Sequence, residues 1–255
     1  MSDSWQRRFP GLRLTFALCA LGWPSLAVAG TVCYGVLGGS SDPESIALVE
    51  SIASARIIGP SVRVYFVLGQ SDKTPTCPSM APECRARAFL VPGNDVLIGS
   101  SSNGFHCATY RSSTGVETGG YLPAAAIALP LRAEVKPVDW VGTWRRDRDA
   151  NIKLTLAAGG QAITVDGDAT WGSFDPQRVK RGAVHEGNLD ETAVPHGNLI
   201  ALGQGYDGSS SPLDKTAITD CLVRLRLFGR YLVVEDNQSC GGANVSFTGV
   251  YTRMK

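Results

Sequence analysis

Residues 221–236 read CLVRLRLFGRYLVVED, and they decide the class of fold. The runs 221–228 and 231–235 are the two most apolar strand-like segments of this part of the chain, and they contain the β-branched and aromatic residues that strands prefer. Only Gly229-Arg230 separates them, and a two-residue connection that begins with glycine indicates a tight hairpin. The stretch therefore predicts two adjacent antiparallel strands and a β-rich fold.

Similar short runs surround this hairpin. The first is WVGTW at 140–144, and Gly-rich connections separate the runs from one another. We expect turns at 158–160 and at Gly167-Asp168. The other strands are expected at 152–157, 162–165, 169–172, 198–202 and 244–253. Seven or eight short strands of this kind predict a small antiparallel β-barrel or sandwich.

A separate unit precedes this one. Between them lies PLRAEVKPVDW at 130–140, where two prolines bracket charged residues, so we expect domains at 30–135 and 136–255. In the first domain, SDPE at 41–44 indicates the start of a helix that runs to about Ala55. Short strands are then expected at 63–68, 86–90, 95–99, 105–110 and 119–122.

The N-terminus has the three parts of a secretory signal peptide. Three arginines precede a short apolar run at 14–21 (LTFALCAL), and the small-residue cleavage pattern AVA follows at 27–29. The run is far shorter than the roughly 20 residues that a membrane-spanning helix needs, and no second run approaches that length. We therefore expect residues 1–29 to be removed and the protein to be periplasmic or secreted.

Removal of that leader changes the charge of the chain. It takes away three of the 24 basic residues and one of the 23 acidic residues, which leaves 21 and 22 and a net charge of −1. Binding to nucleic acid or to an anionic membrane surface requires a basic patch, and the sequence has no run of like charges. We therefore expect no nucleic-acid partner and no stable membrane insertion.

Six cysteines follow the leader, and an even number in an exported chain predicts three disulfides. They are Cys33, Cys77, Cys84, Cys107, Cys221 and Cys240. Zinc is the competing interpretation, but the sequence has no C-x-x-C, and a spacing of six residues between Cys77 and Cys84 is not typical of zinc ligands. Cys221 begins one hairpin strand and Cys240 lies just beyond the other, so we expect these two to form a structural bridge. The pairing of the other four stays open.

Residues 63–131 resemble a bacterial SH3-like domain in three motifs. VPGNDV at 91–96 looks like the diverging-turn segment, GFHCA at 104–108 occupies the place of the tryptophan-bearing strand, and GGYLPA at 119–124 is similar to the closing motif. The chain departs from the family where the dipeptide FH replaces the usual tryptophan. The resemblance implies a small barrel with an aromatic ligand groove. The residues that would line this groove are Phe105, Tyr110 and Tyr121.

The second unit resembles two kinds of β-domain. Gly142-x-Trp144 near its start and Arg253 near its end look like the closure of lipocalin-like barrels, in which the cation lies over the indole face. YLVVEDNQSCGGANVSFTGVY at 231–251 is similar to the C-terminal β-domain of exported bacterial proteins, some of them related to lysozyme-inhibitor lipoproteins. This second resemblance covers roughly residues 138–255. Together they imply a lipocalin-like barrel in which Gly142, Trp144 and Arg253 are structural.

No motif indicates catalysis. The sequence has no G-x-S-x-G elbow and only three histidines, and we expect the cysteines to be paired rather than nucleophilic. Ligand-capable side chains gather at 185–196, but their spacing matches no metal cluster, and glycine and proline there indicate a solvated loop. We predict no metal site and no cofactor. Trp171, expected at the mouth of the second barrel, is the remaining binding candidate.

These features favour a mainly β protein, an SH3-like small barrel followed by a second small antiparallel barrel or sandwich, that binds a ligand without catalysis. The two resemblances imply that its partner is cell-wall peptidoglycan or a wall-lytic enzyme that it inhibits. Two alternatives stay open. One is an envelope hydrolase with a carboxylate or loop-borne metal site, and the other is a structural protein of envelope assemblies.

Overall fold

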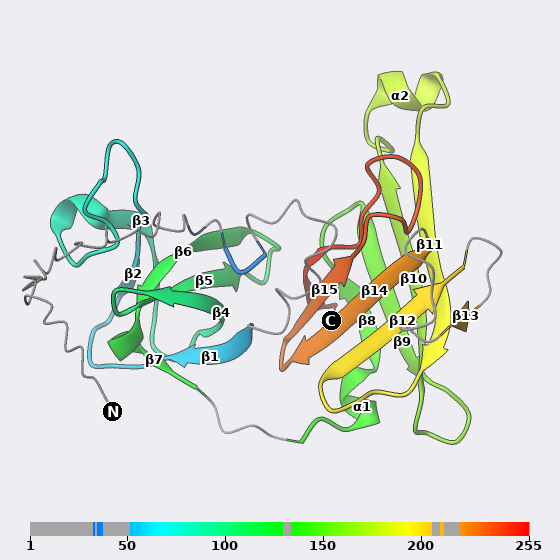
Figure 1. The fold of residues 1–255 in the computed structure, drawn as a ribbon, viewed down its shortest axis with the longest axis horizontal. Helices are drawn as coiled ribbons and strands as arrows, with labels where there is room; N and C mark the ends of the chain where they lie inside the picture. The colour runs from blue at the N-terminus through cyan, green and yellow to red at the C-terminus, as the bar shows by residue number, and fades with distance from the viewer. Residues whose placement is uncertain are drawn as a thin grey trace, which may run out of the picture. The chain divides into compact units, whose positions relative to one another are not determined.

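The computed structural model describes Cys33 and residues 35–37, 52–129, 134–205, 210–211 and 220–254. Two antiparallel β-sheets account for most of this part of the chain, which confirms the predicted mainly β, disulfide-bonded fold (Figure 1). The predicted signal peptide, 1–29, lies outside the described residues. Within them, no helix is long and apolar enough to cross a membrane.

The first sheet is a half-barrel of seven strands in the order β3-β2-β6-β5-β4-β1-β7. Its strands are β1 (Ala53–Ile57), β2 (Val64–Val67), β3 (Arg85–Leu90), β4 (Asp95–Ser102), β5 (Phe105–Arg111), β6 (Glu117–Pro123) and β7 (Ile127–Ala128). Two short 3-10 helices, η2 (Pro82–Cys84) and η3 (Ala124–Ala126), lie between them. Inward side chains such as Phe66, Val96 and Leu122 form its hydrophobic cluster.

Turn chemistry explains the β4–β5 hairpin. Asn103 and Gly104 both have positive φ angles, 50° and 79°, as the favoured two-residue hairpin turns require. All five strands predicted for this unit are present, with ends that differ by a few residues. The predicted helix that ends near Ala55 is wrong over its last residues, which belong to β1, and its earlier residues lie outside the described ones. Pairing of β1 with both β4 and β7 decides its conformation, because such non-local contacts override local helix signals.

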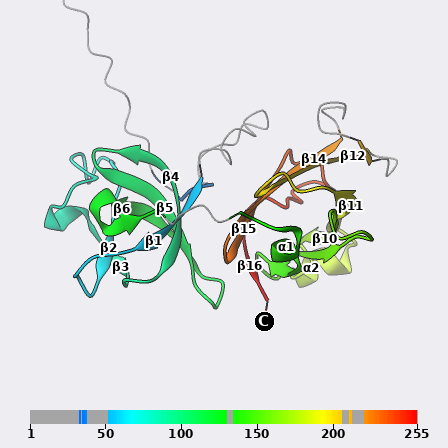
Figure 2. The same cartoon turned by 90° about the horizontal axis from the view of Figure 1, so that it is seen from below.

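The second sheet has nine strands in the order β11-β10-β9-β8-β16-β15-β14-β12-β13. They are β8 (Gly142–Arg145), β9 (Ala150–Leu156), β10 (Ile163–Trp171), β11 (His185–Ala193), β12 (Leu199–Gln204), β13 (Ser210–Ser211), β14 (Cys221–Phe228), β15 (Tyr231–Asp236) and β16 (Gly249–Arg253). Two short helices, α1 (Pro137–Trp140) and α2 (Pro176–Lys180), accompany it. Figure 2 shows the sheet curving until β11 approaches β12. The Asp190 backbone N–H donates to Gln204 Oε1 at 3.1 Å across this seam, so the barrel is nearly closed.

The predicted turn at Gly167-Asp168 is wrong, because β10 runs unbroken from Ile163 to Trp171. Gly167 points toward the core. A Cβ atom there would lie 3.2 Å from both Leu189 Cδ1 and Phe247 Cε1. Glycine at this position therefore relieves crowding on the inner face of a continuous strand and does not mark a turn of the chain.

The predicted solvated loop at 185–196 is also wrong over most of its length. β11 (His185–Ala193) pairs with β10 along its whole length. Leu189 and Glu191 are buried on the inner face, while Asp190 between them is exposed. The alternation of inward and outward residues in β11 is hard to recognise in the sequence, because Leu189 is the only large apolar residue among its inward positions.

The prediction of three disulfides is confirmed, and Cys221 pairs with Cys240 as expected. The pairs that the sequence left open are Cys33–Cys107 and Cys77–Cys84. Three disulfides are compatible with an oxidising compartment outside the cytosol. The last strand of the first sheet ends at Ala128 and the first strand of the second begins at Gly142, while the domain bounds 30–135 and 136–255 stay a prediction.

Candidate functional site

A groove crosses the first sheet where β3, β2 and β6 lie side by side. Its volume is about 360 Å³, and the strands line it together with the loops 58–61 and 79–81 and helix η3. Val67, which is only 4 % exposed, lies at its base. Tyr65 comes from the same strand and is partly buried. The groove therefore has a strand floor and sides that come from three connections.

Most of the lining consists of apolar side chains. Ala81, Ala125 and Ala126 contribute single methyl groups, and Met80, which is 75 % exposed, adds a flexible thioether at the rim. Binding sites for small ligands combine an apolar lining with a few polar groups that fix orientation.

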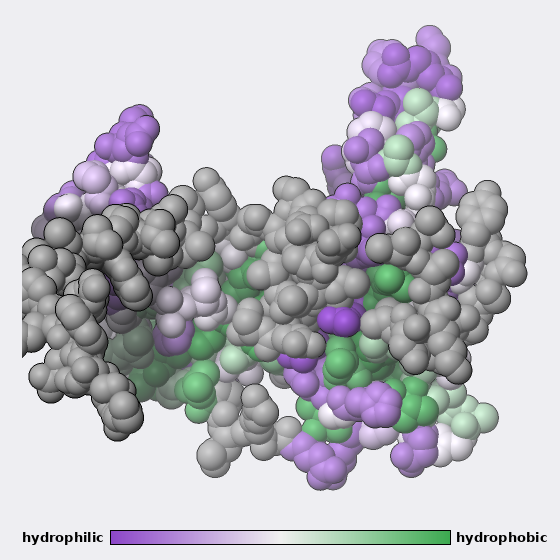
Figure 3. Space-filling model, in the orientation of Figure 1, coloured by the Kyte–Doolittle hydropathy of each residue, from purple (hydrophilic) through white to green (hydrophobic). Residues whose placement is uncertain are grey.

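A disulfide supports one side of the groove. Cys77 and Cys84 are bonded to each other across the loop that carries residues 79–81. Ser79 Oγ accepts from the Ala81 backbone N–H at 3.3 Å and lies 3.1 Å from Cys84 Sγ. The longer loop between β2 and η2 projects from the sheet and presents a hydrophilic surface (Figure 3). The bridge keeps the groove-lining part of this connection against the sheet.

Two aromatic rings and two arginines form a row, and all of them except Phe89 line the groove. Tyr65 and Phe89 are opposite each other in the β2–β3 pair, with ring centres 5.6 Å apart. The Arg85 guanidinium lies 5.1 Å from the Tyr65 ring centre, and the Arg63 guanidinium lies 4.6 Å from that of Phe89. Each cation therefore lies near the ring of an aromatic side chain, a contact that favours a defined orientation.

Arg63 and Arg85 belong to the groove lining, and no Asp or Glu does. Residues 58–94, which supply most of the lining, contain four basic and two acidic residues. Ion pairs of the described residues include Arg56–Asp95, Arg111–Glu117, Arg146–Asp147 and Arg178–Asp175. None of them involves a residue of the groove, so its charge is positive.

The three aromatic residues predicted to bind ligand lie elsewhere in the first sheet. Phe105 and Tyr121 are buried in the cluster that surrounds the Cys33–Cys107 and Cys77–Cys84 bridges. Tyr110 is partly buried and packs against the cluster of the inner face. None of the three lines the groove, although Tyr121 pairs with Val67 at its base. Their role in ligand binding stays a prediction.

Tyr65 and Arg85 were not among the binding residues predicted from the sequence. RVY at 63–65 and RARAF at 85–89 each place arginine and an aromatic residue at a spacing of two or four. In a strand, residues at such spacings share one face. Two strands with the same pattern, adjacent in a sheet, would have indicated this row of side chains.

Trp171 ends β10 and is partly buried. The Arg178 guanidinium from α2 lies 3.9 Å from the centre of its ring, and the His185 ring is 5.4 Å away. His185 Nδ1 is 2.6 Å from the Ala243 carbonyl oxygen. The indole thus contacts protein groups on more than one side, and its role as a ligand-binding residue stays a prediction.

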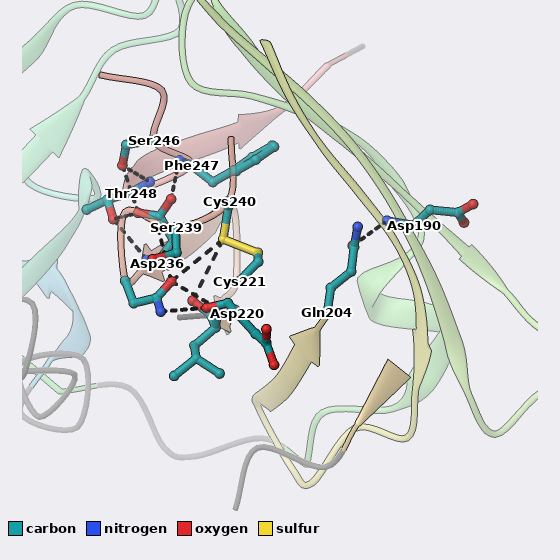
Figure 4. Close-up of a disulfide and its surroundings, with 12 residues drawn as sticks. Asp190, Gln204, Asp220, Cys221, Asp236, Ser239, Cys240, Ser246, Phe247 and Thr248 are labelled. Carbon is teal, nitrogen blue, oxygen red and sulfur yellow. Dashed lines mark hydrogen bonds between the residues drawn. A yellow bond between two sulfur atoms is a disulfide. The ribbon is translucent and has the colours of Figure 1, made fainter. Parts of the chain in front are cut away.

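The residues predicted to be structural in the second sheet lie together as two groups. Arg253 lies over the Trp144 ring next to Gly142. The Cys221–Cys240 bridge joins the start of β14 to the segment after β15 (Figure 4). Beside it, Asp236 accepts hydrogen bonds from Ser246 Oγ, the Phe247 N–H and Thr248 Oγ1 at 2.7, 3.0 and 2.6 Å.

A second hollow, of about 340 Å³, lies on the outer face of β9, β10 and β11. Asp166, Asp168 and Asp190 line it together with Lys153. Across the described residues, no group of three or more His, Cys, Asp or Glu side chains is placed to hold a metal ion. This hollow is a polar outer sheet face.

Comparison with known proteins adds no relative. No family model, no curated protein and no solved structure matches this chain. The likeness of the first unit to SH3-like domains, and of the second to the β-domain of lysozyme-inhibitor-type proteins, therefore stays a proposal. The groove on the first sheet is the feature from which a function can be inferred.

Proposed function

We propose that this chain is a non-catalytic, exported binding protein whose groove on the first sheet holds the ligand. The observation that carries the proposal is the lining of the groove, which combines mostly apolar side chains with the partly buried Tyr65. The bridges Cys33–Cys107 and Cys77–Cys84 tie together the sheet that bears it. A preformed site on a covalently tied frame binds with little loss of conformational entropy.

Cell-wall peptidoglycan is the ligand class that we favour. Its stem peptides are short, rich in alanine and bear carboxylates, so they match a lining of alanines with arginine beside it. The three disulfides support a location outside the cytosol. The two sequence resemblances point to the wall as well. Inhibition of a wall-degrading enzyme is the other role that these resemblances imply, and the same experiment detects it.

The test is co-sedimentation of the oxidised, full chain with purified peptidoglycan, together with the rate at which lysozyme clears a peptidoglycan suspension. Tyr65→Ala and Met80→Gln change the groove at partly buried and exposed positions. Val116→Gln is the matched control, because Val116 is 63 % exposed and lies outside the groove. Circular dichroism verifies that each variant folds.

We expect the wild-type chain and Val116→Gln to sediment with the wall, and both groove variants to stay largely in the supernatant. Slower clearing with sedimentation indicates that the protein shields the wall. Slower clearing without sedimentation indicates that it acts on lysozyme and replaces peptidoglycan by the enzyme as the partner. If the protein neither sediments with the wall nor slows clearing, both roles are overturned.

A further inference from the structure

Two guanidinium groups line the groove, and the lining includes no Asp or Glu. Arg63 and Arg85 are both exposed and both belong to the lining. Within the described part of the chain, neither takes part in an ion pair. The groove lining therefore combines alkyl groups with two positive charges that the described residues leave unneutralised.

The rings hold these cations in place. Arg85 lies by the Tyr65 ring and Arg63 by the Phe89 ring, at 5.1 and 4.6 Å. The two rings contact each other, so one cation lies near each end of a row that spans both strands. A guanidinium positioned by an aromatic ring retains N–H donors that suit a carboxylate, which it can bind through two parallel hydrogen bonds.

We infer that the groove selects peptides that carry carboxylates, with Arg85 and Arg63 as the residues that each bind one. This inference rests on the proposed function and names the chemistry of the ligand. The apolar part of the lining, including Ala125 and Ala126, holds the short alkyl side chain next to the carboxylate. A bare phosphate would match the charge but would leave the apolar part of the groove unused.

The probe is a muropeptide with free carboxylates, compared with the same muropeptide after conversion of its carboxylates to amides. Binding to the oxidised, full chain is measured by isothermal titration calorimetry at low and at physiological salt. We expect the free acid to bind at least about tenfold more tightly than the amide, as a charge-assisted hydrogen bond does relative to a neutral one. The difference decreases as salt screens the charges.

Charge-neutralising variants test which arginines cause the preference for the free acid. Arg85→Gln and Arg63→Gln are each expected to weaken binding of the free acid about tenfold and to weaken binding of the amide much less, because a neutral hydrogen bond is weaker than a charge-assisted one. Arg87→Gln is the matched control, since Arg87 is exposed on the same strand β3 but does not line the groove. It removes the same charge and is expected to change binding less than about twofold.

Each outcome separates this inference from the proposed function. If acid and amide bind equally, carboxylate selection is wrong while peptide binding stands. If Arg87→Gln weakens binding as much as Arg85→Gln does, the effect is one of net charge and the assignment to the groove arginines is wrong. If inorganic phosphate competes at the same concentration as the muropeptide with free carboxylates, the site takes anions in general and carboxylate selection is wrong. Absence of binding by both muropeptides, with no sedimentation of the wall, overturns the proposed function itself.

Discussion

The guanidinium of Arg253 lies 4.7 Å from the centre of the Trp144 ring. The two residues are opposite each other in the pair formed by β16, the last strand, and β8, the first strand of the barrel. Arg253 also donates to the carbonyl oxygen of Asp139. A Cβ atom on Gly142 would lie 3.1 Å from Arg253 Cδ, so glycine leaves the space that the arginine side chain occupies. This is the contact that the lipocalin-like resemblance implies.

Replacement of Arg253 by alanine is expected to lower the free energy of unfolding by about 1 kcal/mol, because an exposed cation–π contact and one hydrogen bond are lost. Urea unfolding followed by tryptophan fluorescence measures the change. Arg145→Ala serves as control, since Arg145 is exposed on the same strand as Trp144, and its effect should stay within about 0.5 kcal/mol. Equal effects of the two variants would contradict the role assigned to Arg253.

The three disulfides should differ in what they contribute to stability. They close segments with sequence separations of 74, 19 and 7 residues for Cys33–Cys107, Cys221–Cys240 and Cys77–Cys84. Loop-closure entropy then predicts contributions of about 4.5, 3 and 2.5 kcal/mol in that order. Pairwise Cys→Ser variants, compared by their urea midpoints, test this order. Loss of Cys77–Cys84 should also weaken ligand binding more than loss of Cys221–Cys240, because only the former bridge borders the groove.

Asp236 anchors the segment that follows the Cys221–Cys240 bridge. Its buried carboxylate accepts from two hydroxyl groups and one backbone N–H. Asp236→Asn keeps the shape but replaces one acceptor by a donor, so we expect a loss of about 2–3 kcal/mol in unfolding free energy. Asp168→Asn, at an exposed position of β10, controls for the change of charge. A loss of similar size in both variants would show that the hydrogen bonds of Asp236 are not its cause.

Tyr251 should cause the free energy of unfolding to decrease at alkaline pH. Its hydroxyl donates to the Phe247 carbonyl oxygen at 2.8 Å inside the barrel, and burial raises its pKa above the ordinary value. The unfolded chain therefore releases this proton first, and stability falls as the pH rises above about 10. Tyr251→Phe removes this dependence and costs about 1 kcal/mol at pH 7 through the lost hydrogen bond.

Urea unfolding of the wild type and of Tyr251→Phe at pH 7 and pH 10.5 measures the effect. The difference in unfolding free energy between the two proteins is expected to shrink at the higher pH. A constant difference would mean that Tyr251 ionises alike in the folded and the unfolded chain. Tyr231, whose pKa burial raises to about 12, remains in both proteins and so does not affect the comparison.

Local signals made much of the strand pattern predictable. The hairpin of β14 and β15 follows from apolar runs on either side of Gly229, whose φ is 60°. The Cys221–Cys240 bridge could be predicted from the same hairpin, because its two strands bring the cysteines together. The sequence predictions were wrong where a residue type has two possible structural causes. Gly167 has the residue type of a turn, yet it lies within β10, where a Cβ atom would crowd Leu189 and Phe247.

By itself, the sequence determined the β class, the number of disulfides and the hairpins, since these depend on neighbours in the chain. Only the tertiary structure decided the pairs Cys33–Cys107 and Cys77–Cys84, because alternative pairings are equally compatible with the spacing. It also decided the groove, whose lining comes from segments as far apart as 58–61 and Ala126. The pairing of β1 with β7 brings these segments together, and the Ile58 N–H donates to the Ala126 carbonyl oxygen at 3.0 Å. Such contacts between distant residues leave no periodic signal in the sequence.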